Sequence, residues 1–411
     1  MCLEVNPSKC ELFTIPATES QNLQQDTLTI LAQIELALPN VKSMNRSNLL
    51  LLGAPIFEEA IDTVLLEKLD DLKRMREKLV FIDPHDVLFL LRGCYAIPKL
   101  TYCLRSAPTF KSMATLKLYD QEMKECLEEI LNIRLDEQAR DQCSLPVKQG
   151  GFGIQMASDI ALPCFLSSGY GAALGASNLL PNEVSEATYA DLDAALSAWK
   201  ERIQNTEEEE QPLPENLTVQ APWDQPLYEL KFKQLLDKQT TPSEKARLPA
   251  VSSPHASDWL LAYPLPTLEL KLDSTSLQMS CALRLGSPIF KPFKCICGTI
   301  VDSSGRHGLS CQKVKGTYPR HLLINKILGR DMARAQVTAT LEQTNLCQGD
   351  GKQPDGLTLL PWTMGRHLVW DVTCRDTLCQ SYVYQTSKLA KLRKKEKRKK
   401  SSNIANWRKI I

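Results

Sequence analysis

The sequence lacks the segments that carry a chain into or across a membrane. Met1 is followed by mixed polar sequence, so no N-terminal run resembles a signal peptide, and no stretch approaches the roughly 20 apolar residues of a membrane span. The 14 cysteines are scattered over 411 residues and do not form a disulfide framework. These absences argue against a secreted or membrane protein and predict a reducing, intracellular compartment.

A large excess of one charge is also absent, because the formal net charge is only +1. This balance hides an uneven distribution. Residues 388–400 hold nine Lys or Arg against one Glu, whereas Glu207 to Glu210 form an acidic run. A basic run can be a solvated face, a nuclear-import signal or a phosphate-binding tail. Import and nucleic-acid binding can coexist, and the run alone does not separate them.

Hydrophobic residues make up 43% of the chain, which is enough for folded cores. The length allows about two to four domains. Apolar residues recur at helical spacing over 57–170, which predicts a helical region. The prolines and the acidic run of residues 181–255 predict a long, partly disordered linker, with a helix over Leu227 to Lys238 as an interruption. Compact sequence resumes at Ser257.

A phosphate-cradling P-loop is absent. Gly150, Gly151 and Gly153 form a glycine-rich loop, but no predicted strand precedes this loop and no Gly-Lys-Ser/Thr ending follows it. The more plausible role of the three glycines is to let the backbone pack closely against another part of the chain.

Four soft metal ligands lie within seventeen residues, namely Cys295, Cys297, His307 and Cys311. Thiolate and imidazole ligands suit a tetrahedral Zn²⁺ ion. His307 and Cys311 are one helical turn apart, which would place both on one face of a helix. The Cys-x-Cys spacing is tighter than the usual Cys-x-x-Cys, so coincidence is the alternative. Cys281 and Cys347 are substitutes if one ligand is misassigned.

Two aspartates, Asp355 and Asp371, lie sixteen residues apart on a predicted β-hairpin. The residues after Asp355 form the first strand, residues 361–365 supply the turn, and residues 367–374 form the second strand. Carboxylates on neighbouring strands can converge on Mg²⁺, which is usually held by one or two carboxylates and phosphate oxygens. Alternatively, the Pro-Asp-Gly sequence around Asp355 only makes a turn, and Asp371 is an exposed strand residue.

Four stretches of the chain carry a family resemblance. They are Leu3–Cys10 (Leu-Glu-Val-Asn-Pro-Ser-Lys-Cys), Leu52–Ile56 (Leu-Gly-Ala-Pro-Ile), the Cys/His cluster, and Pro354-Asp355 with Asp371. In this order they resemble the C-terminal half of a non-LTR retrotransposon protein with a restriction-like endonuclease. The first is similar to the segment after the catalytic Tyr-x-Asp-Asp loop of the reverse transcriptase, and the second to the primer grip. The last two resemble the family's Cys-Cys-His-Cys knuckle and its PD-(D/E)xK nuclease signature.

The resemblance implies a multidomain α+β protein. A mostly helical thumb-like region is followed by a small zinc knuckle and an α/β restriction-endonuclease-like domain. The implied divisions are 1–56 for a remnant of the reverse-transcriptase palm, 57–180 for the thumb-like domain, 181–255 for the linker, 256–315 for the zinc-knuckle region and 316–400 for the nuclease domain with its basic C-terminal helix. The implied partners are DNA and element RNA, with no membrane, and the implied location is the nucleus.

Tyr-x-Asp-Asp is absent from the chain. Polymerase chemistry needs carboxylates that hold two metal ions, so the chain is not expected to be an autonomous reverse transcriptase. By its resemblance it is either a fragment or a decayed copy, and the missing polymerase half is then an expected partner.

The resemblance assigns Asp355 and Asp371 to Mg²⁺. In the simplest PD-(D/E)xK pattern, a lysine lies two residues after the second acid. Thr373 occupies that position here and supplies no charge. In restriction-like retrotransposon nucleases the lysine lies on the following helix, which points to Lys388 as the catalytic lysine, with Lys391 second.

Other polar residues complete the expected site. Glu342, expected on the preceding helix, resembles an extra acid near the metal, and Tyr384 would share a helix face with the catalytic lysine. His321 is a candidate, although a lone helical histidine is more often a surface residue. Gln353 departs from the family's Arg or Lys before Pro-Asp. The first hypothesis is a Mg²⁺-dependent DNA endonuclease that nicks target DNA. The alternative is a catalytically inactive, zinc-dependent nucleic-acid-binding remnant.

Overall fold

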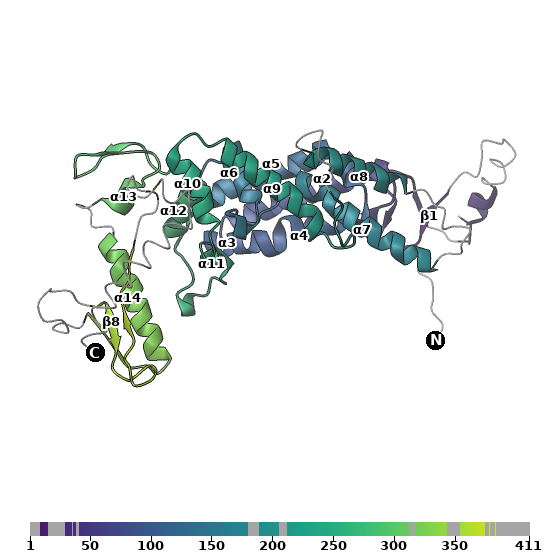
Figure 1. Ribbon diagram of the computed structural model, residues 1–411. Helices are drawn as coiled ribbons and strands as arrows, with labels where there is room; N and C mark the ends of the chain where they lie inside the picture. The colour runs from purple at the N-terminus through teal and green to yellow at the C-terminus, as the bar shows by residue number, and fades with distance from the viewer. Residues whose placement is uncertain are drawn as a thin grey trace, which may run out of the picture. The chain divides into compact units, whose positions relative to one another are not determined.

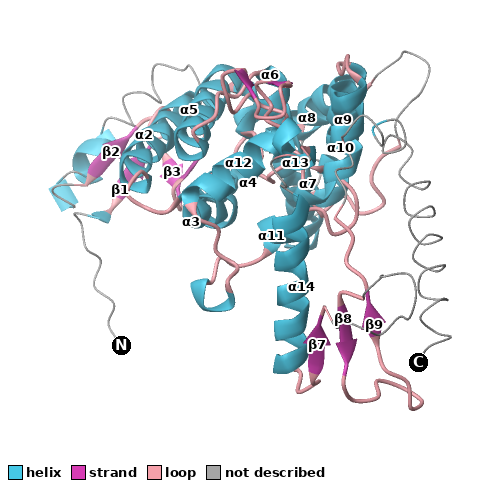
Figure 2. Ribbon diagram, turned by 90° about the vertical axis from the view of Figure 1, so that its left-hand side faces the viewer, coloured by secondary structure: helices cyan, strands magenta, loops and turns pink. Residues whose placement is uncertain are grey.

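The computed structural model describes residues 9–14, 29–34, 36–37, 41–179, 189–204, 212–311, 313, 317–342, 354–374, 378 and 383. These residues are mostly helical and include small sheets (Figures 1 and 2). The chain divides into two compact units: unit 1 contains residues 1–130 and 153–231, and unit 2 contains residues 131–152 and 232–411. The multidomain α+β class expected from the sequence is confirmed at this level.

Unit 1 is built mainly from helices. They are η2 (Glu58–Ala60), α2 (Ile61–Leu79), α3 (Pro84–Leu90), the π-helix η3 (Leu91–Tyr95), α4 (Ile97–Ser106), η4 (Thr109–Lys111), α5 (Met113–Leu131), α7 (Ala157–Leu179), α8 (Ala190–Ile203) and most of α9 (Ala221–Asp237). Helix α7 packs against α4 and α8. The helical spacing read from the sequence is reproduced in α2, where Ile61, Leu65 and Leu72 are buried.

Two small sheets precede these helices in unit 1. β1 (Glu11–Phe13) pairs in parallel with β2 (Lys42–Met44), and β3 (Leu50–Leu51) forms an antiparallel hairpin with β4 (Ala54–Pro55). The stretch compared with a primer grip forms the turn and second strand of this hairpin, with Gly53 at a φ of +84°. Residues 3–8 of the other N-terminal stretch lie outside the described residues.

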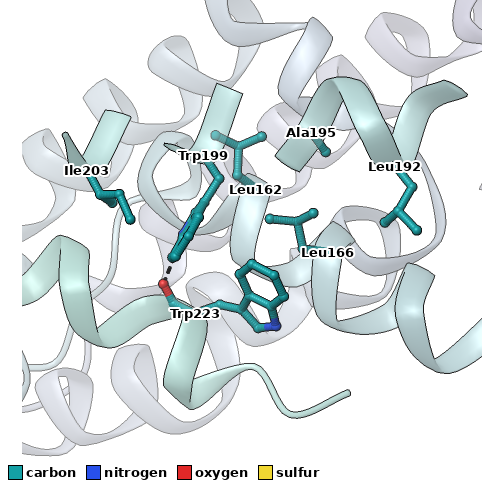
Figure 3. Close-up of a cluster of buried hydrophobic side chains, with 7 residues drawn as sticks. All are labelled: Leu162, Leu166, Leu192, Ala195, Trp199, Ile203 and Trp223. Atoms are coloured by element: carbon teal, nitrogen blue, oxygen red, sulfur yellow. Dashed lines mark hydrogen bonds between the residues drawn. The ribbon is translucent and has the colours of Figure 1, made fainter. Parts of the chain in front are cut away.

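Two tryptophans form the centre of a hydrophobic cluster in unit 1. Trp199 of α8 and Trp223 of α9 are almost completely buried, and their rings meet edge to face with centroids 4.9 Å apart (Figure 3). The indole N–H of Trp199 also donates to the Trp223 carbonyl at 3.1 Å. Aromatic pairs in this arrangement stabilise a core by about 0.5–1.5 kcal/mol beyond their buried area.

The linker predicted for residues 181–255 is wrong for most of its described part. Residues 190–203 form α8, residues 221–237 form α9, and residues 242–251 form α10. Prolines led to the error, although proline is compatible with the first turn of a helix. Pro242 occupies such a position in α10, after a capping box made by Thr241 and Glu244. Local proline content was therefore outweighed by helix capping and by burial of the tryptophans.

One helical stretch also departs from the sequence expectation about membranes. Pro84–Ser106, which covers α3, η3 and α4, is long and apolar enough to cross a membrane by length and composition. The same test is passed by core helices of soluble proteins. Leu91, Leu100 and Leu104 of this stretch are completely buried in unit 1, and 44% of its apolar window is buried.

Unit 1 also contains a buried carboxyl group with an unusual environment. Asp224 of α9 is 7% exposed; its Oδ2 accepts a hydrogen bond from Gln220, and its Oδ1 has no hydrogen-bond partner among the described residues. Burial raises the pKa of Asp224 to about 7.

Replacing Asp224 by asparagine is expected to stabilise the protein at neutral pH. The folded state holds the carboxyl proton more tightly than the unfolded state, so the free energy of unfolding falls as pH rises from about 4 to about 7. Asp224→Asn removes this fall and is expected to raise the free energy of unfolding at pH 8 by up to ~4 kcal/mol. Urea unfolding at pH 5 and pH 8 measures the difference. The exposed Asp193→Asn is the control, and a gain that is equal at both pH values would contradict the assignment.

Unit 2 joins a helical part to two small sheets. Its elements are α6 (Glu137–Ser144), η5 (Val147–Gln149), α10 (Pro242–Val251), α11 (Asp258–Leu261), η7 (Pro266–Leu268), α12 (Ser274–Leu285), β5 (Phe293–Lys294), β6 (Ile300–Val301), α13 (His307–Ser310), α14 (Thr317–Arg334), β7 (Ala339–Leu341), β8 (Gly356–Thr358) and β9 (Val369–Trp370). β7, β8 and β9 form an antiparallel sheet in that order, and α14 packs against β7 (Figure 2).

The glycine-rich loop packs tightly in unit 2, as expected from the sequence. A Cβ atom on Gly151 would lie 2.0 Å from the carbonyl oxygen of Leu145, which no side chain can tolerate. The buried Arg284 donates to the carbonyl oxygens of Val147 at 2.9 Å and of Gly151 at 3.2 Å. The loop therefore binds a side chain of its own unit through its carbonyl groups.

Gly151→Ala is expected to lower the free energy of unfolding by about 1–3 kcal/mol or more, because the backbone must move to admit the methyl group. Gly175→Ala is the matched control, since that helical glycine has open space where the methyl group would lie and alanine is a better helix former. Chemical denaturation of both variants compares the two sites. A Gly151→Ala protein as stable as the wild type would show that the loop is not closely packed.

Candidate metal centre and acidic hairpin

The four soft ligands predicted from the sequence come together in unit 2. The ligand atoms of Cys295, Cys297, His307 and Cys311 all lie within 4.8 Å of one another. The sulfur atoms of Cys295 and Cys311 are 3.8 Å apart, and the Cys297 sulfur is 3.1 Å from His307 Nε2. Sulfur ligands at about 2.3 Å from a tetrahedral ion lie about 3.8 Å from each other. This group can therefore hold a metal ion.

A hairpin and a short helix supply these ligands. The strands β5 and β6 are joined by a turn in which the Gly298 N–H donates to the Cys295 carbonyl at 2.8 Å. Gly298 has a φ of +93°, a conformation that glycine adopts without strain. Helix α13 then carries His307 at its start and Cys311 directly after its end, with the Cys311 N–H donating to the His307 carbonyl at 2.9 Å. The predicted single helical turn between these two ligands is confirmed.

The surroundings of the cluster suit metal binding. Cys295, Cys311 and Val301 form a small buried group with Cys297 packed against it. Hydrogen bonds from the side chain and backbone of Thr299 lower the pKa of Cys297 to about 6. Thiolates, rather than thiols, bind metal ions. Cys281, considered as a substitute ligand, is buried in α12 and is not a member of the group, and Cys347 lies outside the described residues.

The predicted hairpin with two aspartates is present as β8 and β9. Gly356 pairs with Trp370 and Leu357 pairs with Val369, and the turn beyond contains an isolated bridge between Thr363 and Arg366. Asp355 and Asp371 each lie one residue outside the Gly356–Trp370 pair. Both acids therefore stand at the same, open end of the hairpin, as the sequence pattern requires.

Asp355 is held by a dense set of contacts. Its Oδ2 forms a hydrogen bond with His321 Nε2 at 3.0 Å and accepts another from the Val372 N–H. Its main-chain carbonyl accepts from Asn325 Nδ2 at 2.7 Å and from the Glu342 N–H at 3.0 Å. The Asp355 side chain is only 13% exposed. Its carboxylate is thus fixed in position and engaged on one oxygen.

The pairing of His321 with Asp355 was missed by the sequence analysis, which treated His321 as a lone histidine. His321 and Asn325 are four residues apart on α14 and therefore lie on the same face of the helix. Both form hydrogen bonds with Asp355, the residue directly before β8. Two polar residues at helical spacing were the available signal. Their partner Asp355 is 34 positions from His321 and 30 from Asn325, so only the fold reveals it.

Gly356 has a packing role instead of the turn role considered from the sequence. It lies in β8, and a Cβ atom there would come within 1.9 Å of the Trp370 ring. The indole N–H of Trp370 donates to Asn325 Oδ1 at 2.9 Å. The missing side chain at Gly356 therefore lets the tryptophan lie across the strand and reach α14.

Of the remaining predicted site residues, Glu342 and Thr373 are described by the structure and the others are not. Glu342 was expected on a helix, but α14 ends at Arg334 and Glu342 directly follows the strand β7, with its side chain exposed. This expectation is wrong because residues 339–341, which directly precede Glu342, form the strand β7 and not a helix. Thr373 is exposed. The predicted lysine Lys388, the second-choice lysine, Tyr384, Gln353 and the basic tail lie outside the described residues.

Among the described residues, the Cys/His group alone gathers three or more ligands of metal-binding type. Asp355 and Asp371 share an end of the hairpin without such a group around them. A scan against protein-family models and a search of curated proteins found no match to the chain. The functional argument therefore rests on the residues and their geometry.

Proposed function

We propose that the chain is a retrotransposon-derived nucleic-acid-binding protein with a structural zinc ion in the Cys295, Cys297, His307 and Cys311 group. The four ligand atoms within 4.8 Å of one another are the observation that carries the proposal. Three sulfurs and one imidazole nitrogen are a donor set that zinc prefers, and four protein ligands leave no open position for chemistry. The zinc ion would fix β5, β6 and α13, elements too short to form a core alone.

The proposed ligand is DNA, with element RNA as a second partner, and the proposed location is the nucleus. The support is the basic run of residues 388–400, together with the order of motifs that resembles the retrotransposon family. In this proposal, residues 57–180 correspond to the thumb-like domain, 256–315 to the zinc-knuckle region and 316–400 to a restriction-endonuclease-like domain.

Metal analysis combined with DNA binding tests this function. The purified chain is expected to contain about one zinc ion. It is expected to bind a labelled duplex with an affinity that falls steeply as salt rises from 50 to 200 mM, by roughly 10³-fold if about six phosphates are contacted. A chain that contains no zinc after expression in zinc-supplemented medium, or that binds no nucleic acid at low salt, would overturn the proposal.

A second candidate function is Mg²⁺-dependent nicking of DNA, favoured by the position of Asp355 and Asp371 at one end of the hairpin. Phosphodiester hydrolysis needs a metal that polarises the phosphate and activates water. The two carboxylates would hold that ion, with Lys388 near the developing charge and with Glu342 as an additional acid. The contact with His321 occupies one of the Asp355 oxygens that would otherwise be available to Mg²⁺. For this reason nicking is the second candidate, after nucleic-acid binding.

A further inference from the structure

Unit 1 contains a cavity that the proposed function does not use. It has a volume of about 540 Å³ and is lined by residues of α2, η3, α4 and α5, of which α2, α4 and α5 are labelled in Figure 2. Cavities of about 300–1,000 Å³ are the size that small ligands occupy. Its floor is apolar: Leu72 and Leu79 of α2 are buried, and Met75 lies between them.

The rim of this cavity carries an excess of positive charge. Lys68, Arg74 and Lys78 of α2 and Lys99 of α4 line it, against a single acid, Asp71, which pairs with Arg74. In the part of the chain that the structure describes, no carboxylate forms an ion pair with any of the three lysines. Lys68 and Lys78 are ten positions apart on α2, which corresponds to about 15 Å along the helix. Positive charge is therefore distributed along the rim instead of being concentrated at one point.

Two tyrosines complete the lining. Tyr119 of α5 is buried, and its hydroxyl donates to the Ala96 carbonyl at 3.1 Å, which fixes the ring. Tyr95 is the last residue of the π-helix η3, and Lys99 Nζ lies 5.9 Å from the centre of its ring. π-Helical turns are rare in proteins as a whole, but those that occur are frequently found at functional sites. Next to the cavity, Ile82 of the lining and its neighbour Phe81 are exposed.

We propose that this cavity binds an unpaired nucleotide of single-stranded nucleic acid, with its base against Tyr95 and the apolar floor and its phosphates on the rim lysines. Single-strand sites combine a basic track for the backbone with aromatic rings on which bases stack. The positive charge of the rim favours an anionic ligand. Because the charged residues are distributed along α2, they can contact several phosphates. The size and the aromatic lining suit one base. The site depends on neither the zinc group nor the acidic hairpin.

Fluorescence anisotropy of the full chain with a short labelled oligothymidylate tests the site. The double variant Lys78→Glu/Lys99→Glu is expected to weaken binding by at least tenfold and to reduce the salt dependence by about two phosphate contacts. Tyr95→Ala is expected to weaken binding by roughly tenfold, whereas Tyr95→Phe keeps the ring and is expected to bind as the wild type does. Lys73→Glu is the control, because Lys73 lies on α2 outside the cavity and pairs with Asp70.

Photo-crosslinking of an oligonucleotide that carries 4-thiouridine locates the contact. The expected crosslinked peptides contain Tyr95 or Lys99. The same peptides are expected from the Cys311→Ser variant, so this result tests the cavity independently of zinc binding. Equal affinity of the wild type, the lysine double variant and Tyr95→Ala would overturn the proposal. Unlabelled oligonucleotide is expected to displace the labelled one from this site. If polyglutamate or phosphatidylserine vesicles displace it and unlabelled oligonucleotide does not, the ligand is not a nucleotide.

Discussion

If the Cys/His group holds the proposed zinc ion, Cys311→Ser is expected to remove that ion almost completely. Losing even an outer hydrogen-bond partner of a metal ligand costs about 10–100-fold in metal affinity, and losing one of four ligands costs more. Cys311 is 5% exposed and lies directly after α13, so a serine there also leaves a gap in the small buried group with Cys295 and Val301. Metal analysis of the purified variant measures the zinc-to-protein ratio.

Loss of the proposed zinc ion is also expected to release β5, β6 and α13, which that ion would hold together. β5, β6 and α13 contain two to four residues each, which is too few to be stable alone. Limited proteolysis should therefore cut between residues 293 and 311 much faster in Cys311→Ser than in the wild type. Exposed Cys94→Ser is the neutral control. Cys281→Ser tests the substitute ligand, and zinc loss there with zinc retained in Cys311→Ser would show that the ligands are misassigned.

The Cys/His group could be predicted because its information is local. Four ligands within seventeen residues and one helical turn between His307 and Cys311 define the cluster without knowledge of the rest of the fold. The same is true of the hairpin, whose alternation and turn residues lie in one stretch. The pairing of Asp355 with His321 joins positions 34 apart, and no local pattern encodes it.

The errors in the fold have a related cause. Prolines and acidic residues indicate a linker when each residue is judged by its own preference. Trp199 and Trp223 instead bury large rings against each other across two helices, and burial of such area outweighs weak local preferences. The helix before Glu342 was also expected to continue past Arg334. From Gln336 to Leu341, however, polar and apolar residues alternate, which is the period of a strand, and residues 339–341 form β7. The outcome was a helix predicted too long and Glu342 assigned to the wrong element.

If the chain cleaves DNA, Asp371→Asn is expected to abolish Mg²⁺-dependent nicking of supercoiled plasmid, with a reduction of about 100-fold or more. Asparagine keeps the size of the side chain but removes the charge that holds the ion. Asp355→Asn is expected to act in the same way. Asp331→Asn is the control, because that exposed acid of α14 pairs with Arg334 and lies outside the hairpin.

His321 makes this experiment more discriminating. If its contact with Asp355 only orients the carboxylate, His321→Gln retains a hydrogen-bond donor and should lower nicking mildly, with an unchanged requirement for Mg²⁺. If the contact instead withholds the carboxylate from the ion, His321→Ala should lower the Mg²⁺ concentration that gives half-maximal nicking. Absence of nicking by the zinc-loaded wild type with Mg²⁺ or Mn²⁺ would refute the nuclease function. Zinc content and nucleic-acid binding would then define the protein, and Asp355 would remain as the residue that joins α14 to the hairpin through His321 and Asn325.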